Sequence, residues 1–223
     1  MIRVPAGSFL MGDDSGNDDE KPVHPVFVNA FDLGKFTVTN SEFGEFLDQN
    51  DYDFPRNYLN DAAPDHPATH INWFDAVAYC LWLSETSGDR YRLPYEAEWE
   101  YAARSGSVTN IFPWGARGWN ERKELHERFK NGPEAVGSFQ PNEFGLHDMG
   151  INVHEWCLDW YDPSYYSSSP PENPKGPSTG SRRSSRGGSW RHQIKITRCA
   201  ARSSIPPEYR YADYGFRILR ERN

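Results

Sequence analysis

We begin with the segment SRRSSRGGSWRHQIKITRCAARSSIPPEYRYADYGFR, residues 181–217, which combines a Gly-Gly turn with an indole, several cations and several tyrosines. Two adjacent glycines allow the backbone to approach a ligand or another segment closely. The segment also contains Cys199 and His192, whose side chains can bind metals or take part in redox or acid-base chemistry. These features predict that the segment lines the floor of a ligand-binding cleft. The chemistry of that cleft depends on Cys199 and His192.

The composition predicts how the core is built. Of the 223 residues, 37% are hydrophobic and 15% are aromatic, with eight tryptophans. A chain of this length can bury more than half of its unfolded surface, so we expect a core of a few large rings. The 18 glycines and 17 prolines are spread along the chain, which indicates many turns in a folded domain. We therefore predict an α+β fold with little regular secondary structure, in one domain over residues 1–223.

The charge distribution restricts the partners. The net charge of -8 argues against nucleic acid as a partner. Residues 182–202 nevertheless hold a local basic block, for which two interpretations stay open: a solvated face, or ion pairs with the acidic excess. The block consists of Arg182, Arg183, Arg186, Arg191, Lys195, Arg198 and Arg202.

The three cysteines, Cys80, Cys157 and Cys199, are odd in number and show no CxxC spacing. Neither a disulfide framework nor a zinc ribbon is indicated, and we predict that they are buried as small hydrophobic residues. The N-terminal residues lack the apolar region of a signal peptide, and no apolar run reaches 18 residues. We therefore expect a soluble, cytoplasmic protein without a membrane partner.

Three segments carry helix signals. Thr39 and Glu42 have the spacing of a capping box, and Asn72 precedes apolar residues at helical intervals. Pro94 is predicted to occupy the first turn of a third helix, which should end near 105–106. Short apolar runs bounded by Gly, Pro or Asn predict strands in SFLMG, VFVNAFDL, GGSW and YGFRIL. The Ser- and Pro-rich residues 165–185 are predicted to form a mobile surface loop.

Nine motifs follow one another in a fixed order. They are VPAGSFLMG (4–12), GKFTVTNSEF (34–43), HPATHINWFDAVAYC (66–80), RLPYEAEWEYAARSG (92–106), FPWG (112–115), NEFGLHDMGINVHEWCLDWYD (142–162), RGGSW (186–190), RCAARS (198–203) and YGFR (214–217). In these residues the chain resembles the formylglycine-generating enzyme family, also called the sulfatase-modifying-factor family, over nearly its whole length. The resemblance implies a C-type-lectin-like α+β fold, which agrees with the composition.

The copper site that this resemblance implies is not repeated here. Formylglycine-generating enzymes hold copper through two cysteines shortly after the GGS turn, and soft thiolates suit Cu(I). Here His192 stands at the first cysteine position and no cysteine stands at the second, while Cys199 matches a different cysteine of the family. We therefore expect no thiolate copper site and no activity in sulfatase maturation.

The same segment predicts a ligand pocket that combines a stacking ring, a fixed charge and a titratable ring. This combination suits a polar or anionic small molecule or peptide. The predicted pocket residues are Ser189, Trp190, Arg191 and His192, with Arg202 and His154 added by resemblance. For the histidines two alternatives stay open. They line the pocket or bond carbonyl groups, or they share copper or iron with Cys157 or an acid as a third ligand.

The run GLHDMGINVHEW (145–156) resembles a calcium site of the family. Ca²⁺ prefers carboxylate and carbonyl oxygens at short spacing. By resemblance, Asp148 and Glu155 supply side-chain oxygens, and Ile151 and Val153 supply carbonyls. The alternative is an acidic turn held by its own hydrogen bonds. A second family calcium site would fall in residues 118–137, where the sequence departs from the family pattern, so we do not carry it over.

Two functions remain compatible with the sequence. The first is a calcium-stabilised, lectin-like ligand-binding domain that is not active in sulfatase maturation. The second is a metal-dependent oxidoreductase that acts on a peptide or small molecule through His154 and His192. Glu96, Glu98 and Glu100 are predicted to serve the helix dipole and its cap rather than catalysis. No nucleotide-binding or serine-hydrolase motif is present in the sequence.

Overall fold

The computed structural model describes residues 1–60, 63–116, 132–191 and 194–222. The helices are α1 (Asn40–Gln49), α2 (Trp73–Ser87) and α3 (Glu96–Ala103), with short 3-10 turns η1 (Asp18–Glu20), η2 (Arg56–Tyr58), η6 (Tyr165–Ser168) and η7 (Ile194–Thr197). The strands are β1 (Ile2–Val4), β2 (Gly7–Met11), β3 (His24–Val28), β4 (Phe31–Leu33), β5 (Tyr91–Arg92), β6 (His154–Trp160), β7 (Arg183–Arg186), β8 (Arg202–Ile205), β9 (Tyr214–Gly215) and β10 (Leu219–Arg220). The predicted α+β class with much irregular chain is confirmed.

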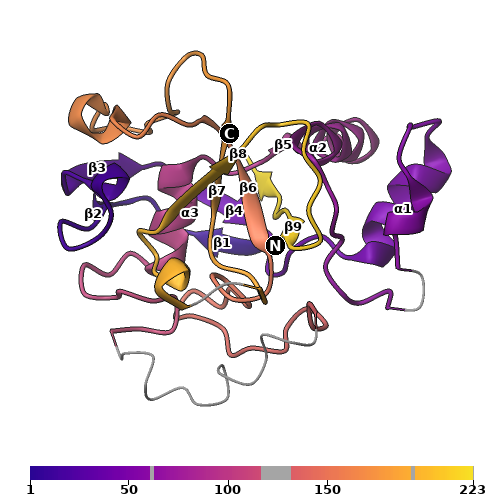
Figure 1. Ribbon diagram of the computed structural model, residues 1–223, viewed down its shortest axis with the longest axis horizontal. Helices are drawn as coiled ribbons and strands as arrows, with labels where there is room; N and C mark the ends of the chain where they lie inside the picture. Colours follow the sequence, from indigo (N-terminus) through magenta and orange to yellow (C-terminus); the bar gives the residue numbers. More distant parts are fainter. Residues whose placement is uncertain (61–62, 117–131, 192–193, 223) are drawn as a thin grey trace.

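The described strands form three small sheets, in the orders β1-β4-β10-β5, β2-β3 and β8-β7-β6-β9. All pairs are antiparallel except β6 with β9, which is parallel and sets His154 opposite Tyr214. Figure 1 shows α3 near the centre, between the β2–β3 hairpin on one side and α1 and α2 on the other. The third sheet positions the predicted site residues, because β6 begins at His154 and β7 leads into the Gly-Gly turn.

The first two helices begin where their capping residues predict. Glu42 N donates to Thr39 Oγ1 at 3.2 Å, and Thr39 N donates to Glu42 Oε2 at 2.8 Å, which completes the predicted capping box. Asn72 and Asp75 form the same reciprocal pair at the start of α2. These confirmed caps satisfy backbone donors that have no partner within the helix.

The third helix differs by one detail. It begins at Glu96 with Tyr95 as its extended N-cap, so the prediction that Pro94 occupies the first turn is wrong. The physical reason is that Glu98 accepts from Tyr95 N at 2.7 Å, which places the cap after the proline. The predicted end near 105–106 is confirmed, since the C-cap is Arg104.

The strand prediction holds for SFLMG. VFVNAFDL and YGFRIL are each divided between two shorter strands, and GGSW forms none. β7 ends at Arg186, and Gly187 has a φ of 75°, a left-handed conformation that leaves the ladder. β6 is a strand that the sequence patterns do not predict, since its burial is almost continuous rather than alternating. The predicted loop 165–185 contains η6 and the start of β7, and Tyr166 within it is buried.

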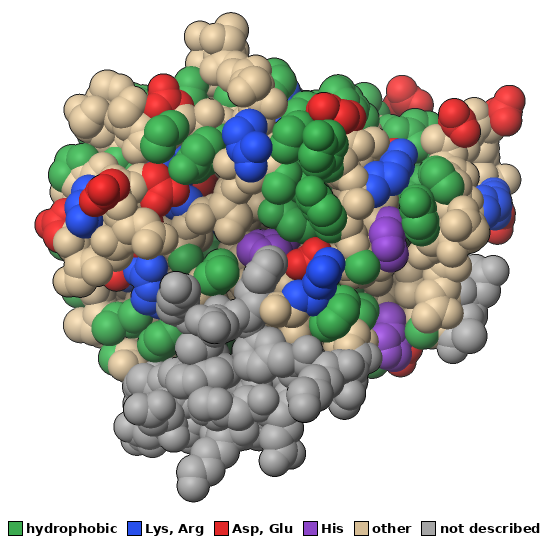
Figure 2. Space-filling model, in the orientation of Figure 1, with side chains coloured by type: hydrophobic (Ala, Val, Ile, Leu, Met, Phe, Trp, Pro, Cys, Tyr) green, Lys and Arg blue, Asp and Glu red, His purple; other side chains and the backbone are tan. Residues whose placement is uncertain are grey.

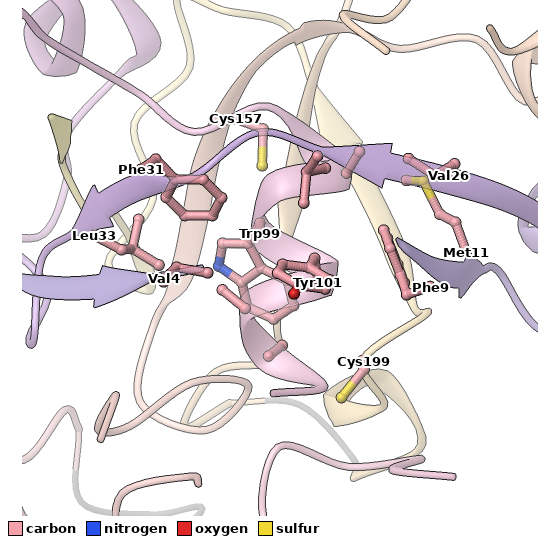
Figure 3. Close-up of a cluster of buried hydrophobic side chains, with 14 of the residues drawn as sticks. Val4, Phe9, Met11, Val26, Phe31, Leu33, Trp99, Tyr101, Cys157 and Cys199 are labelled. Carbon is pink, nitrogen blue, oxygen red and sulfur yellow. The ribbon is translucent and has the colours of Figure 1, made fainter. Parts of the chain in front are cut away.

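Two clusters of buried side chains form the core. One surrounds Trp99 of α3 and includes Val4, Phe9 and Tyr101, as Figure 3 shows. The other joins α1 and α2 through Phe43. Both depend on aromatic rings, as the composition predicts. In the described part of the chain, no helix has the length and apolar character that crossing a membrane requires.

Candidate functional site

The candidate site begins where β7 runs into the Gly-Gly turn. A Cβ atom at Gly188 would lie 2.5 Å from Thr197 Cγ2 and 3.1 Å from Gly150 O, so only glycine fits there. The turn packs on the preceding turn 148–153, because Trp190 N donates to Asn152 O at 3.0 Å. Residues near 150 and near 190 are therefore held together by backbone contacts.

Asp213 is the centre of this site, although the sequence analysis did not select it. Ser189 Oγ donates to Asp213 Oδ2 at 2.8 Å, and Arg191 Nη1 lies 3.6 Å from Asp213 Oδ1. Ser189 and Asp213 are both buried, whereas 48% of the Arg191 side chain is exposed. The site therefore presents the Arg191 guanidinium at the surface, next to the buried Asp213 carboxylate.

His154 reaches the same place from β6. Its backbone N donates to Asp213 O at 2.8 Å, and its ring stacks on Tyr214 with centroids 4.8 Å apart. The parallel pairing of β6 with β9 brings these residues together. The structure thus unites four predicted pocket residues, Ser189, Trp190, Arg191 and His154. The Arg191 guanidinium lies 5.6 Å from the centroid of the neighbouring Trp190 ring.

His192 lies outside the described residues, so the predicted pairing of His154 with His192 is not described either. Within the described ranges, no group of three or more His, Cys, Asp or Glu side chains is placed to hold a metal ion. A shared copper or iron ion at these histidines stays a prediction.

Arg202 occupies a different environment from the other predicted pocket residues. Its Nε and Nη2 donate to the two oxygens of Glu96 at 3.1 and 2.8 Å, and its Nη1 donates to Asp19 O at 2.8 Å. The side chain is buried, with the guanidinium 4.4 Å from the Tyr166 ring centroid. In these contacts Arg202 serves as a core ion-pair partner of α3.

The glutamates of α3 lie on two sides of the helix, as their spacing predicts. In addition to capping the helix, they form ion pairs with arginines. Glu98 caps the helix and binds Arg92 on one side. Glu96 and Glu100 face the interior, where Glu100 Oε2 accepts from Arg186 Nη2 at 2.5 Å. Burial alone would raise the pKa of Glu96, but the guanidinium groups of Arg202 and Arg186 lower it below its usual value.

Some residues of the basic block are neutralised by such pairs. Arg186, Arg198 and Arg202 bind carboxylates, so the interpretation as ion pairs with the acidic excess is confirmed for these three. In Figure 2, Lys and Arg side chains are scattered over the visible face and form no single basic patch among the coloured residues.

The residues of the predicted calcium site are already engaged with other groups. Asp148 Oδ2 and Oδ1 accept from Gly137 N at 2.6 Å and Phe139 N at 3.1 Å. Burial raises the pKa of Asp148, even though these backbone donors favour its charged form. Its φ of 62° fits the sharp turn, in which Ile151 N donates to Asp148 O.

Glu155 is equally occupied. Arg217 Nε and Nη2 donate to its Oε2 and Oε1 at 3.0 and 2.9 Å, and Trp99 Nε1 donates to Oε2 at 2.7 Å. Its carboxylate does not fit a calcium ligand here, since a cation bound to it would face the Arg217 guanidinium. These contacts favour the alternative of a turn held by its own hydrogen bonds. Calcium binding through the Ile151 and Val153 carbonyls stays a prediction.

All three cysteines are buried, as the sequence analysis predicts. Cys157 and Cys199 lie in the Trp99 cluster, on either side of Trp99 in Figure 3, and Cys80 lies in the other cluster. Burial raises the pKa of Cys199 to about 12 and also raises the pKa of Cys80 and Cys157. Protonated thiols inside apolar clusters do not fit a two-thiolate Cu(I) site.

Together these elements define an α+β domain of short strands and long loops, with a polar surface site where two glycine-containing turns meet. The chain belongs to the sulfatase-modifying factor enzyme 1-like family, whose family model matches residues 1–222. The resemblance inferred from the nine motifs is thereby confirmed.

Three known proteins illustrate this relationship. The chain is 33% identical to the formylglycine-generating enzyme of Streptomyces coelicolor, over 99% of this chain and 89% of that protein. It is 31% identical to the inactive C-alpha-formylglycine-generating enzyme 2 of Mus musculus, over 74% of this chain and 70% of the relative. The structure of PvdO from Pseudomonas aeruginosa superposes with a TM-score of 0.81 at 29% identity, covering 99% and 93% of the two chains.

Proposed function

We propose that this chain is a ligand-binding member of its family that does not mature sulfatases, and that the Asp213-centred site recognises a polar or anionic small molecule or peptide. The observation that carries the proposal is the position of the thiols. All three are enclosed in apolar clusters, so none is available as a surface thiolate to bind copper or to attack a substrate.

The ligand class follows from Arg191 and its surroundings. The guanidinium is half exposed, yet Asp213 and the neighbouring Trp190 ring restrict its position. A planar, fixed cation beside an aromatic face suits carboxylate or other oxyanion groups on a ligand with some apolar surface. An apolar ligand would gain nothing from this cation.

Similarity to the relatives does not decide whether this chain has formylglycine-generating activity. A formylglycine-generating enzyme and an inactive homologue match this chain at 33% and 31% identity. The residues at the reactive positions must decide, and here His192 stands at the first cysteine position and no cysteine stands at the second.

The alternative function is a metal-dependent oxidoreductase that uses His154 and His192. The His154 ring is buried and stacks on Tyr214, the residue after Asp213, which supports this alternative. Titration with Co²⁺ tests it, because a ligand-field absorption band that disappears in both His154→Ala and His192→Ala indicates a shared metal.

The decisive experiment incubates the protein with Cu(I), oxygen and a CxPxR-type sulfatase peptide and follows the peptide by mass spectrometry. We expect the peptide thiol to persist, whereas the enzyme of Streptomyces coelicolor serves as the positive control in the same assay. Copper-dependent conversion of the cysteine to an aldehyde would overturn the proposal.

Binding is measured separately, with anionic and neutral versions of a short acetylated peptide. We expect Arg191→Ala to weaken binding of the anionic version. Arg182→Ala is the matched control, because Arg182 is an exposed arginine that bonds Ser204 rather than Asp213. If both variants and the parent bind the anionic peptide equally well, the Asp213-centred site does not recognise it.

A further inference from the structure

A cleft of about 320 Å³ opens elsewhere on the surface. Its walls are the β3–β4 turn (28–31), the segment 173–175, the start of α3 with Arg92, and the C-terminal residues Glu221 and Arg222. The described residues of the Asp213 site are not among its lining, so this cleft is separate from the proposed function. Its volume lies at the small end of the range for ligand sites.

The cleft is held open by backbone contacts. Phe27 N donates to Pro171 O at 2.7 Å, and Asn173 N donates to Phe27 O at 2.8 Å, so the segment 171–173 is attached to the edge of β3. Asn173 Oδ1 also accepts from Asn29 N at 2.8 Å. Asn173 has a φ of 45°, a left-handed conformation that asparagine adopts more readily than most residues other than glycine. A wall that backbone contacts fix in this way is typical of a preformed site.

The cations that line the cleft differ in whether a carboxylate pairs with them. Arg92 binds Glu98 and Glu221, and Arg222 binds Asp32. Lys175 lines the same cleft, is exposed, and has no carboxylate within ion-pair distance among the described residues. Lys175 is therefore the lining cation that can offer its charge to a ligand.

Tyr95 supplies the apolar surface of the cleft. The Lys175 ammonium lies 5.9 Å from the ring centroid, and the Arg92 guanidinium lies 4.7 Å from it. Burial raises the pKa of Tyr95, so its hydroxyl group stays protonated and able to donate at neutral pH. The Asn173 Nδ2 group is a second donor in the wall, since Oδ1 is the atom that bonds Asn29.

We propose that this cleft binds a small organic monocarboxylate, with Lys175 as the counter-ion of the carboxylate and the Tyr95 ring against its apolar body. The donors at Asn173 and Tyr95 complete the recognition of the carboxylate oxygens. A doubly charged phosphate fits less well, because Glu98 and Glu221 line the same cleft and repel added negative charge.

The test titrates benzoate into the protein and follows the backbone amide signals of Asn29, Tyr95 and Lys175 by NMR. We expect saturable shifts at these signals, and none with the neutral analogue benzamide. Lys175→Met should weaken benzoate binding about fivefold, the upper range for an exposed ion pair. Tyr95→Leu should weaken the binding of benzoate as well, because it removes the ring.

Lys35→Met is the matched control, since Lys35 is also an exposed lysine beside a ring, 5.1 Å from the Phe36 centroid, and does not line the cleft. Unchanged affinity in this variant supports the proposal, and an equal loss would assign the effect to overall charge and overturn it. The proposal is also overturned if benzoate gives no saturable shift, if benzamide binds as well, or if inorganic phosphate binds more tightly.

Discussion

Glu155 on β6 and Arg217 beyond β9 form a fully buried, two-point ion pair, with nitrogen–oxygen distances of 2.9 and 3.0 Å. The same guanidinium donates to Gly34 O at 2.7 Å and to His147 O at 2.8 Å. One arginine thus joins β6, the chain after β4 and the turn that precedes Asp148. The turn that the sequence marks as a calcium site is in this way tied to the core.

Removing one partner of this pair should be costly. We expect Glu155→Gln to lower the free energy of unfolding by about 3–5 kcal/mol, because Arg217 would stay buried without a counter-charge. Urea unfolding measures the change. Asp48→Asn is the control: its exposed pair with Arg56 should contribute less than about 1 kcal/mol. Similar losses in both variants would contradict a special role for the buried pair.

Removing calcium with a chelator distinguishes the two interpretations of the turn at Asp148, a calcium site and a turn held by its own hydrogen bonds. Because the oxygens of Asp148 and Glu155 already accept hydrogen bonds, a turn held by those bonds alone predicts that EGTA leaves the melting temperature unchanged and that added Ca²⁺ has no effect. A bound ion at 100 times its Kd would add about 2.7 kcal/mol. A clear fall in melting temperature with EGTA, absent from Asp148→Ala, would establish the calcium site.

The thiols should be unreactive in the folded protein. With the pKa of Cys199 near 12, only about one molecule in ten thousand carries its thiolate at pH 8. We expect no reaction with Ellman's reagent under native conditions and reaction of all three cysteines in guanidinium chloride. Rapid native labelling of any one thiol would contradict their enclosure and weaken the proposed function.

Glu96 and Asp159 are buried carboxylates whose pKa values are shifted in opposite directions. The pKa of Glu96 is below its ordinary 4.5, so its stabilising effect is present above that pH and is lost as the pH falls through the folded value. Burial and the nearby Glu96 raise the pKa of Asp159 above 3.8, so the stability it contributes when protonated is lost as the pH rises.

Their amide variants should therefore differ. We expect Glu96→Gln to lower stability by about 3–5 kcal/mol at pH 7 and to flatten the loss below pH 4.5, since Arg202 loses its partner. Asp159→Asn should change stability by less than about 1 kcal/mol at pH 7, because its carbonyl oxygen can still accept from Glu96 N. Denaturant unfolding from about pH 2 to pH 8 measures both, and equal losses would contradict the assignment.

The features that the sequence alone determined are encoded within a few residues. Thr39 and Asn72 cap the first two helices because their partners stand three positions away. The spacing of Glu96, Glu98 and Glu100 separates Glu98 from its neighbours for the same local reason. The order of the nine motifs was sufficient to identify the family, and the missing cysteine pair was visible without any structure.

The tertiary structure alone decided which distant side chains meet. Arg202 and Glu96 are 106 positions apart, and Asp213 reaches His154 only because β6 and β9 run parallel. Strand order and register are set by the whole core, so no short pattern predicts such pairs. β6 escaped prediction because both of its faces are largely buried, which removes the alternation that marks a strand.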